Sequence, residues 1–146
     1  MEAYLIATAC TKFEKKADQT FKSLTEEVYC DLLKSAKVEN GNMIGQAWFG
    51  NCGMGTFGQN NIRGQVCFTP LVQKKLFPER VGIINVEGGC ATGSMAFHGA
   101  WKDVISGTED VSLAIGVEKI YQPNQPEKIQ EIYDGGIDQF DRNEWL

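Results

Sequence analysis

The stretch VGIINVEGGCATGSMAFHGAWKDVISG, residues Val81–Gly107, decides the fold that the sequence predicts. Its first part, Val81–Val86, is a continuous apolar run, which is typical of a buried β-strand. From Ala91 onward, apolar residues recur at helical spacing. Gly107 ends that pattern, at the place where a glycine commonly follows the last turn of a helix. The stretch therefore predicts a buried strand, a short bend and a long helix.

Cys90 lies on the bend between that strand and that helix. Gly88 and Gly89 precede it and predict a tight turn in which at least one glycine has a positive φ or faces a ligand at close range. Backbone N–H groups and the dipole at a helix start favour a thiolate, and they would stabilise an oxyanion beside it. The alternative is a small buried cysteine between two elements, as free cysteines often are. We predict that Cys90 is the nucleophile and that Cys67, near the start of a weaker helix, is its nearest rival.

Length and composition indicate one soluble domain of ordinary charge. The chain has 146 residues, with 14 Lys and Arg against 19 Asp and Glu, for a net charge of −5. That balance argues against the binding of nucleic acid. The first apolar run is short and lacks a basic flank, so no signal peptide is expected, and no stretch is long enough to span a membrane. We therefore expect a cytoplasmic protein without nucleic-acid or membrane partners.

The cysteines and the single histidine limit the chemistry that the chain can support. No two cysteines form a C-x-x-C pair and their number is odd, so neither a disulfide framework nor a zinc site is expected. One histidine leaves the chain poor in metal ligands. We therefore expect a reducing compartment and no metal. The five cysteines are Cys10, Cys30, Cys52, Cys67 and Cys90.

Strand and helix patterns alternate along the chain, which predicts parallel strands joined by right-handed crossovers. We predict an α/β, layered half-fold with helices on both faces of a mixed, mostly parallel sheet. The run Ala3–Thr8 is apolar on both faces, as expected for a strand in such a covered sheet. The predicted central strands are Ala3–Thr8, Val81–Val86 and Val111–Val117, and the other elements are a strand at Met43–Phe49 and a helix at about Val66–Leu76, in which Pro70 delays the start or causes a bend.

The first helix follows a capping box, S-L-T-E at residues 23–26, with Ser23 as the N-cap and Glu26 reaching back. This helix is expected to end at about Ala36. Its buried face is predicted from apolar residues four positions apart, which are Leu24, Val28, Leu32 and Ala36.

The segment of residues 122–146 differs from the rest of the chain. It has two prolines, a glycine pair and six acidic residues against two basic ones, yet it ends on the apolar pair Trp145 and Leu146. Exposed apolar side chains of this kind require a partner surface. We therefore divide the chain into an α/β domain, residues 1–121, and the opening of a further loop subdomain, residues 122–146. The alternative is an amphipathic tail folded back on the sheet.

Residues 53–58 read G-M-G-T-F-G, which matches the G-x-G-x-x-G pattern of dinucleotide-binding loops. Such a loop requires a helix that opens at once and an acidic residue at the end of the next strand, about 20 residues on. Here the residues after Gly58 are polar, and Glu79 precedes its strand. Dinucleotide binding is therefore a minor alternative.

Three motifs together resemble the thiolase family. Residues Gly58–Gln65 read G-Q-N-N-I-R-G-Q, which resembles the family signature G-Q-N-x-x-R-Q, with Asn60 and Arg63 in it. Val86–Ser94 resembles the nucleophile turn of the sterol carrier protein X-type branch, which reads V-E-A-x-C-A-T-G-S/T. Ala114–Lys119 resembles the G-x-E-K that ends the next strand there. The β-ketoacyl synthase III group shares the fold and a cysteine at this turn, but the G-Q-N-x-x-R signature favours thiolase.

The resemblance, which covers residues 1 to about 121, implies acyl transfer on coenzyme A thioesters. A Cys90 thiolate would attack the carbonyl and carry the acyl group, which then passes to CoA in thiolysis or to an acyl-CoA carbanion in Claisen condensation. The CoA thioester is the substrate, and no bound cofactor is implied. The glycines around Cys90 would keep side chains away from the acyl group, whereas Asn60 and Arg63 would support the site or the dimer.

Other parts of the thiolase machinery are missing from the sequence. The family takes one or two histidines and a second cysteine from a C-terminal half, and this chain has only His98. A helix rises ~1.5 Å per residue, which puts His98 about 12 Å beyond Cys90, so we expect it to pack or face solvent. Three interpretations stay open: the N-terminal portion of a longer thiolase, one subunit of a split enzyme, or a non-catalytic module that binds acyl-CoA or scaffolds a partner chain.

The family also implies an assembly. Its members pair the strand equivalent to Val81–Val86 across a two-fold axis. We therefore expect a homodimer, or a complex with a chain that supplies the C-terminal half. The Val81–Val86 strand and the glycine-rich loop Gly50–Gln65 are expected near the interface.

Overall fold

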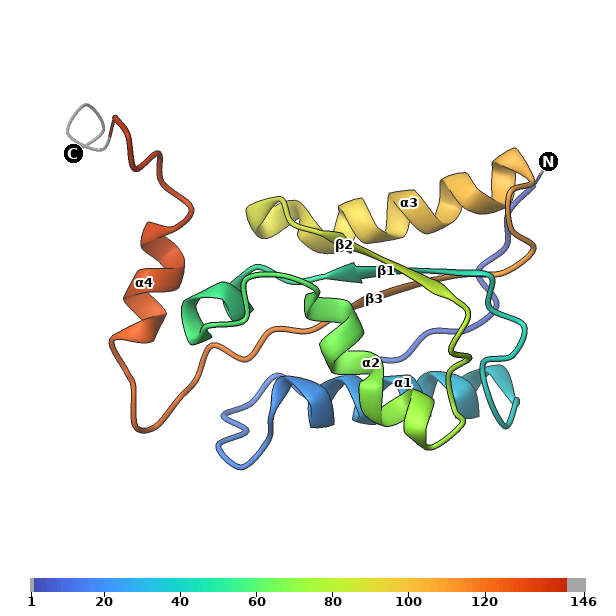
Figure 1. The fold of residues 1–146 in the computed structure, drawn as a ribbon, viewed down its shortest axis with the longest axis horizontal. Helices are drawn as coiled ribbons and strands as arrows, with labels where there is room; N and C mark the ends of the chain where they lie inside the picture. The colour runs from blue at the N-terminus through green and yellow to red at the C-terminus, as the bar shows by residue number, and fades with distance from the viewer. Residues whose placement is uncertain (1, 142–146) are drawn as a thin grey trace.

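A sheet of three parallel strands forms the centre of the computed structural model, which describes residues 2–141. The order across the sheet is β2-β1-β3, and Gln46 at the start of β1 lies opposite both Gly82 and Ser112. The strands therefore start level and end together, at one carboxyl edge (Figure 1). Their bounds are Gln46–Gly50 for β1, Gly82–Val86 for β2 and Ser112–Gly116 for β3.

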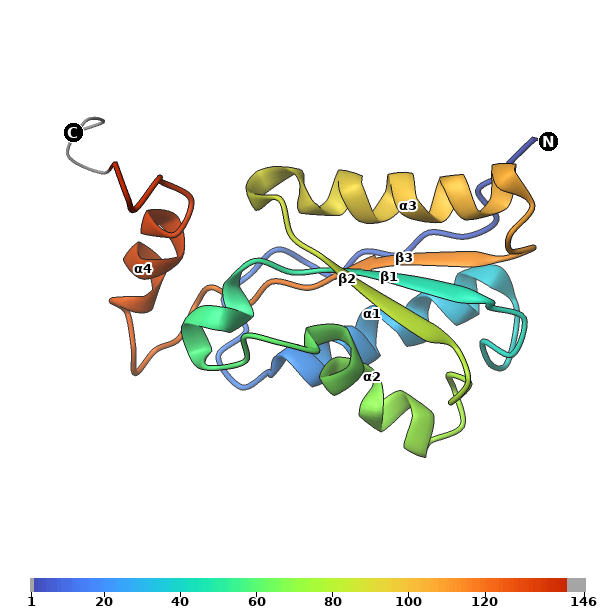
Figure 2. The same cartoon turned by 45° about the horizontal axis from the view of Figure 1, so that its top comes forward.

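Helices cover both faces of this sheet. Figures 1 and 2 show α1 and α2 on one face and α3 alone on the other, which confirms the predicted layered α/β half-fold. The helical elements are α1 (Phe21–Ala36), the 3-10 helix η1 (Gly53–Phe57), α2 (Arg63–Gln73), the 3-10 helix η2 (Gly89–Ala91), α3 (Thr92–Ser106) and α4 (Lys128–Asp134).

Four aromatic side chains form the centre of the core between the sheet and helices α1 and α2. Tyr29, Phe49, Phe68 and Phe77 are each at most 2% exposed. The ring centroids of Phe68 and Phe77 lie 4.5 Å apart at 74°, and those of Phe68 and Phe49 lie 6.2 Å apart at 83°. Edge-to-face pairs of this kind stabilise a core by about 0.5–1.5 kcal/mol each beyond their burial. The Tyr29 hydroxyl donates to the Leu76 carbonyl at 3.0 Å, so its polar end is satisfied.

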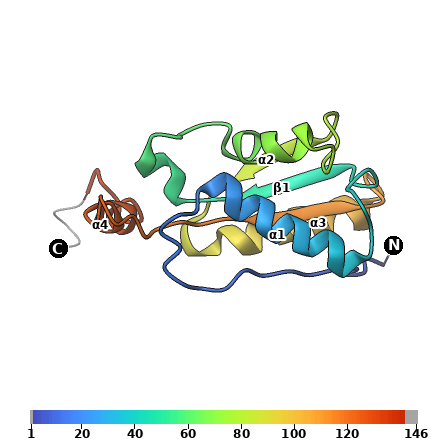
Figure 3. The same ribbon diagram turned by 90° about the horizontal axis from the view of Figure 1, so that it is seen from below.

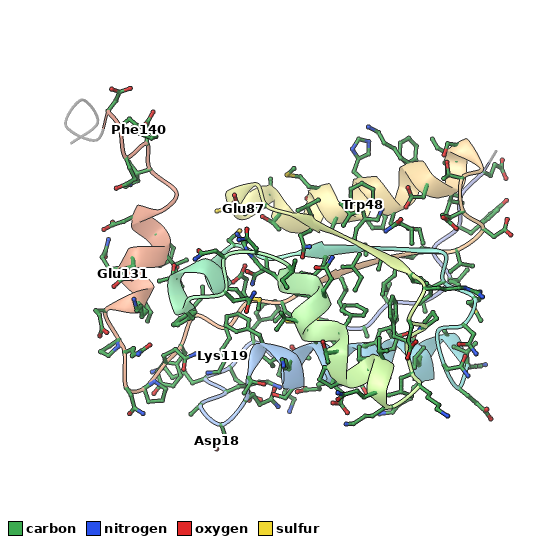
Figure 4. All side chains as sticks on the ribbon, in the orientation of Figure 1. Asp18, Trp48, Glu87, Lys119, Glu131 and Phe140 are labelled. Atoms are coloured by element: carbon green, nitrogen blue, oxygen red, sulfur yellow. The ribbon has the colours of Figure 1, made fainter. Side chains whose placement is uncertain are left out.

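On the other face, α3 is held close to the sheet by Trp48 of β1 (Figure 4). A Cβ atom at Gly99 would lie 2.4 Å from the Trp48 ring, so only glycine allows the helix this close. The Trp48 indole N–H and the Ser112 hydroxyl each donate to the Asp103 carboxylate at 2.7 Å. These contacts fix the axis of α3, and Gly107 ends the helix with φ +75°, as predicted.

The prediction of a central strand at Ala3–Thr8 is wrong. The segment is extended, but it belongs to no strand of the sheet, and Figure 3 shows it running along one flank of the molecule. A cavity of about 390 Å³ lies between residues 3–9, strand β3 and side chains of α1 and α3. Strand structure requires a neighbour that accepts and donates hydrogen bonds. Within the described residues no strand pairs with this segment, and the side chains of Tyr4, Leu5 and Ile6 are between 64% and 76% exposed.

The predicted strand Val81–Val86 is formed, as β2, but its predicted central position and burial on both faces are wrong. The sheet order places β2 at one edge and β3, which was also predicted to be central as Val111–Val117, at the other edge, and β1 takes the centre. Ile84 is 38% exposed and Asn85 is exposed too. An apolar run predicts a buried strand only where both neighbouring positions in the sheet are filled.

The predicted capping box at Ser23 is wrong by one turn. Thr20 is the N-cap of α1, because its side chain accepts the Ser23 N–H at 3.1 Å while the Ser23 hydroxyl accepts the Thr20 N–H at 2.8 Å. The Glu26 carboxylate instead pairs with Lys74. The buried residues of the helix also differ from the predicted row: they are Leu24, Thr25, Tyr29 and Leu33, whereas Val28 and Leu32 are partly buried.

The second predicted helix also begins earlier than expected. Helix α2 starts at Arg63 and not at Val66, because the Asn85 side chain accepts the Gly64 N–H of the first turn at 2.6 Å. Pro70 lies inside the helix, which ends at Gln73. Only the side chain of a neighbouring strand explains this start, so the local sequence could not show it.

After β3 the chain leaves the sheet and forms the short helix α4 to one side (Figure 1). Its Ile132 side chain lies within 3.3 Å of the position that a Cβ atom would take at Gly53, so α4 packs against η1. Tyr133 and Phe140 remain 64% and 100% exposed. The division at residue 121 stays a prediction, and Trp145 and Leu146 lie outside the described residues.

Candidate active site

The carboxyl edge of the sheet brings together three segments that are far apart in the sequence. Cys52 follows β1, the turn around Cys90 follows β2, and Glu118 follows β3. Parallel strands that end level place the residues after them at one edge, where α/β proteins commonly bind ligands. Figure 4 shows Glu87, which opens the Cys90 turn, between the end of β2 and the start of α3.

Cys90 lies in η2, the short 3-10 turn that leads directly into α3, and it is exposed. Gly89 has φ +57°, which confirms the predicted positive φ in the glycine pair, whereas Gly88 has φ −163° and is extended. The α-helix proper begins at Thr92, so Cys90 precedes it by two residues. Even so, Cys90 stays at the positive end of a helix of 15 residues.

Side-chain hydrogen bonds hold the turn in shape. The Glu87 carboxylate accepts the Gly89 N–H at 2.7 Å. The Thr92 hydroxyl accepts the Gly88 N–H at 2.9 Å and donates to the Gly89 carbonyl at 2.7 Å. Thr92 is 7% exposed, so this hydroxyl is an interior part of the site.

The outer side of the turn is open. A Cβ atom placed at Gly89 or at Gly93 would meet no atom within 4 Å. Together with the exposure of Cys90, this leaves room for a substrate to approach the thiol. The arrangement can therefore present a nucleophile beside helix-start N–H groups, which is what covalent acyl transfer requires.

A second thiol, that of Cys52, contacts the turn from the inner side. Its Sγ lies 3.1 Å from the Gly89 carbonyl oxygen and 3.0 Å from the Thr92 hydroxyl oxygen. Partial burial raises the pKa of the Cys52 thiol, so at neutral pH it is a protonated hydrogen-bond donor. The sequence analysis gave no role to Cys52 or Thr92; the signal that could have found them is their place at the carboxyl ends of adjacent strands.

Glu118 anchors the loop that holds Cys52. Its carboxylate accepts the N–H groups of Cys52 and Gly53, the latter at 3.1 and 3.2 Å. Although the residue as a whole is exposed, the carboxyl group lies against this loop. Loss of contact with water raises the pKa of Glu118, and the two N–H groups oppose that rise. In the sequence Glu118 was noted only as part of the G-x-E-K motif.

The G-Q-N-x-x-R-Q signature supports this edge from beneath. The Arg63 guanidinium donates to the Asn51 carbonyl at 2.5 Å and to the Asn60 carbonyl at 3.2 Å. The Gln65 amide donates to the Ile83 carbonyl at 2.8 Å and accepts from the Asn85 amide at 2.8 Å. These contacts join the loop after β1 to β2.

The G-M-G-T-F-G segment does not have the geometry of a dinucleotide-binding loop. Its first five residues form η1, and α2 starts only at Arg63. The Gly53 N–H, which would face a pyrophosphate, is bound to the Glu118 carboxylate. A protein carboxylate in this place leaves no donor for a phosphate.

His98 lies on α3, away from the thiol. It is exposed and stacks on Trp101, with ring centroids 5.4 Å apart at 18°. The expectation that it packs or faces solvent is therefore confirmed. It is the only histidine of the chain, so no imidazole of residues 1–146 lies at the Cys90 turn.

The described residues contain no group of three or more His, Cys, Asp and Glu side chains that could hold a metal ion. Within residues 2–141, no helix has the length and apolar character needed to cross a membrane.

Comparison with known proteins agrees with the three motifs. Residues 3–138 match the family described as the thiolase N-terminal domain. The chain belongs to this thiolase family. Similar curated proteins are benzoylsuccinyl-CoA thiolase subunit BbsB of Thauera aromatica and an acetyl-CoA acetyltransferase of Methanocaldococcus jannaschii, each 32% identical over 117 residues. The match covers 80% of this chain but 28% of each relative, so the thiolase chain described here spans about a quarter of their length.

In this thiolase domain Cys90 is expected to be the first cysteine alkylated. Cys67 is fully buried and burial raises its pKa, so it reacts only when the structure opens, on the order of a hundredfold more slowly. Cys10 is the matched control, since it is also exposed but follows no glycine turn and opens no helix. Because Cys90 lies at a helix start, its alkylation is expected to be about two- to fivefold faster than that of Cys10. Limited iodoacetamide treatment at pH 6–7 with peptide mass spectrometry measures this order, and earlier labelling of Cys67 or Cys52 would contradict it.

Replacement of Gly89 by alanine is expected to destabilise the thiolase domain by about 1 kcal/mol, because φ +57° is unfavourable for a residue with a Cβ atom. The space around the new methyl group is open, so the effect is one of backbone conformation alone. Gly93→Ala, also in open space but within α3, is the control and should not destabilise. Thermal or urea unfolding compares the two, and equal midpoints would refute the argument.

Proposed function

We propose that this chain is the nucleophile-bearing part of a thiolase-type acyltransferase that acts on acyl-CoA and carries the acyl group on Cys90. One observation carries the proposal: an exposed cysteine on a left-handed glycine turn, at the start of α3, with open space on its outer side. Membership of the thiolase family supports the same chemistry. Both relatives are named for CoA-linked activities, a thiolase subunit and an acetyltransferase.

In the first step the Cys90 sulfur attacks the thioester carbonyl carbon. A new S–C bond forms, the bond from the acyl carbon to the CoA sulfur breaks, and CoA leaves as a thiol after taking up a proton. The N–H groups at the helix start are placed to stabilise the negative charge that builds on the carbonyl oxygen. In the second step the acyl group passes to the thiol of another CoA or to the carbanion of a second acyl-CoA.

The base for these proton transfers comes from outside residues 1–146 in this proposal. His98 is stacked on Trp101 and is the only histidine of the chain. The missing base and second cysteine would be supplied by a C-terminal half, either in a longer chain or in a partner subunit. The relative BbsB is named as a subunit, which supports the multi-chain arrangement.

The sequence around the nucleophile supports a finer assignment. V-E-G-G-C-A-T-G-S is closest to the turn of the sterol carrier protein X-type branch, and we propose that branch, with lipid-derived acyl-CoA as substrate and a cytoplasmic location. No cofactor other than the CoA of the substrate is needed, because cysteine carries the acyl group and the thioester carbonyl of the second acyl-CoA stabilises the carbanion.

Incubation with acetyl-CoA and longer acyl-CoAs tests the proposal. The expected result is an acyl mass on the peptide that contains Cys90 and slower iodoacetamide labelling of that peptide. The other four cysteines serve as internal controls in the same digest. Absence of any acyl mass on Cys90, with every acyl-CoA offered and with the partner chain present, would refute the assignment.

A non-catalytic role is the second candidate, and the position of His98 favours it. A thiolase-like chain without its own base could bind acyl-CoA or scaffold an active partner. In that case acyl-CoA would protect Cys90 from alkylation without leaving an acyl mass, which separates the two functions in the same experiment.

We also propose that β2 pairs with a second copy of the chain across a two-fold axis. Its outer edge is unpaired within the described residues and Ile84 is 38% exposed. Ile84→Lys is expected to convert the dimer to a monomer in sedimentation, because a lysine on an edge strand opposes pairing. Phe13→Lys, at a residue that is 99% exposed in a loop, is the control. A monomeric wild-type protein at high concentration would contradict the proposal.

A further inference from the structure

The carbonyl group of Gly89 accepts the backbone N–H of Thr92 within the 3-10 turn, and two side chains hold it as well. The Thr92 hydroxyl donates to its oxygen at 2.7 Å, and the Cys52 sulfur lies 3.1 Å from the same oxygen. The two side chains also contact each other, with 3.0 Å between sulfur and hydroxyl oxygen. The hydroxyl is fixed in turn by the Gly88 N–H, which donates to it at 2.9 Å. The carbonyl that precedes Cys90 therefore points into the protein, towards the end of β1.

The direction of this carbonyl determines the direction of the next N–H. No peptide bond of the described residues is cis, and in a trans peptide the C=O and the N–H point to opposite sides. The Cys90 N–H therefore points away from Cys52 and Thr92, towards the outer side, where Cys90 is exposed. An N–H at the start of a helical turn has no partner within the helix, so it is available to a ligand.

We propose that Cys52 is a positioning residue for the Cys90 nucleophile, because its thiol, together with the Thr92 hydroxyl, fixes the Gly89–Cys90 peptide. The inference rests on the proposed acyl transfer at Cys90 and names what prepares that site. Cys52 acts through Gly89 and does not itself touch the substrate. Rotation of this peptide would turn the Cys90 N–H inward and remove it from the developing oxyanion.

The position and the protonation of Cys52 suit this role. The Glu118 carboxylate holds the Cys52 N–H and the Gly53 N–H, so the loop after β1 cannot withdraw the thiol from the turn. Partial burial raises the pKa of Cys52, which keeps the S–H available as a donor at neutral pH. The contacts form a continuous chain from Glu118 at the end of β3 to the turn after β2.

The test compares Cys52→Ala and Cys52→Ser with Cys30→Ala as the control. Cys30 is half-buried on α1, outside the carboxyl edge of the sheet. For each protein, two rates are measured by peptide mass spectrometry: alkylation of Cys90 by iodoacetamide from pH 6 to 9, and acetylation of Cys90 by acetyl-CoA. Loss of one hydrogen bond in Cys52→Ala is expected to lower the acetylation rate about fivefold. The alkylation rate should stay at the wild-type value, because alkylation builds no negative charge on a carbonyl oxygen and so does not use the Cys90 N–H.

Serine keeps a donor at position 52 and should restore most of the acetylation rate, whereas Cys30→Ala should match the wild type in both rates. Equal acetylation rates in Cys52→Ala and the wild type would overturn the proposal, as would equal losses in the alanine and serine variants. If the alanine variant does not fold, Cys52→Val against Cys52→Ser makes the same comparison. If acetyl-CoA leaves no acetyl group on wild-type Cys90, the acyltransferase proposal fails and the positioning role fails with it. If wild-type Cys90 is acetylated and Cys52→Ala is acetylated at the same rate, only the positioning role fails.

Discussion

Replacement of Cys90 by alanine is expected to abolish acyl uptake from acyl-CoA completely. The reason is that the acyl group is covalently attached to this sulfur, and no other cysteine stands at the start of a long helix on the open side of a glycine turn. Serine is expected to lose on the order of a hundredfold or more in rate, because a hydroxyl is far less ionised than a thiol at neutral pH. The measurement is the acyl mass on the intact protein after incubation with acetyl-CoA.

Cys10→Ala is the matched control for this experiment, since Cys10 is also exposed and lies in the N-terminal segment, away from any helix start. It should retain full uptake. Circular dichroism should show no change for either variant, because neither side chain belongs to the core. Acylation of the Cys90→Ala protein at the wild-type rate would show that another residue is the nucleophile and would contradict the proposed site.

The fold was largely predictable because its signals are local. The strand–turn–helix around Cys90 was recognised from an apolar run, two glycines and helical spacing, and β2, η2 and α3 follow that order. The final glycine of the helix has the left-handed φ expected of it. Elements whose limits depend on distant side chains were misplaced. Helix α2 starts earlier than predicted because the side chain of Asn85, on strand β2, accepts the Gly64 N–H of its first turn.

The position of each strand in the sheet was the least predictable feature. Ala3–Thr8 and Val81–Val86 have the apolar pattern of central strands, yet one is unpaired and the other lies at an edge. An apolar pattern indicates that the side chains of a strand are suited to burial. It does not indicate which strands or helices lie next to that strand in the fold. Side chains of both segments are exposed for this reason, among them Leu5 and Ile84.

The candidate site divides in the same way. Cys90 was found from its own neighbours in the sequence. Cys52 contacts its turn, and Glu118 contacts the loop of Cys52, only because β1, β2 and β3 end level at their carboxyl ends. A sequence in which strand order is not yet known cannot place residues 52 and 118 beside residue 90. The motifs G-Q-N-x-x-R-Q and G-x-E-K marked this edge without showing what their residues bind.

Replacement of Phe68 by alanine is expected to have the largest effect on stability, a loss of about 3–5 kcal/mol in the free energy of unfolding. Phe68 is 1% exposed and its ring lies between those of Tyr29, Phe49 and Phe77 at centroid distances of 5.9, 6.2 and 4.5 Å. Removal of the ring loses its burial and three aromatic contacts, and it leaves a cavity under the sheet.

Phe68→Leu should lose clearly less, because leucine fills most of the same volume. Phe13→Ala is the control, at a phenylalanine that is 99% exposed, and should change the unfolding midpoint little. Urea unfolding followed by fluorescence and circular dichroism gives all three values. Because the loss of stability makes opening of the structure more frequent, the alanine variant should also speed alkylation of Cys67, which is 0% exposed. A loss in Phe68→Ala no larger than that in Phe13→Ala would show that the aromatic cluster is not the core of this domain.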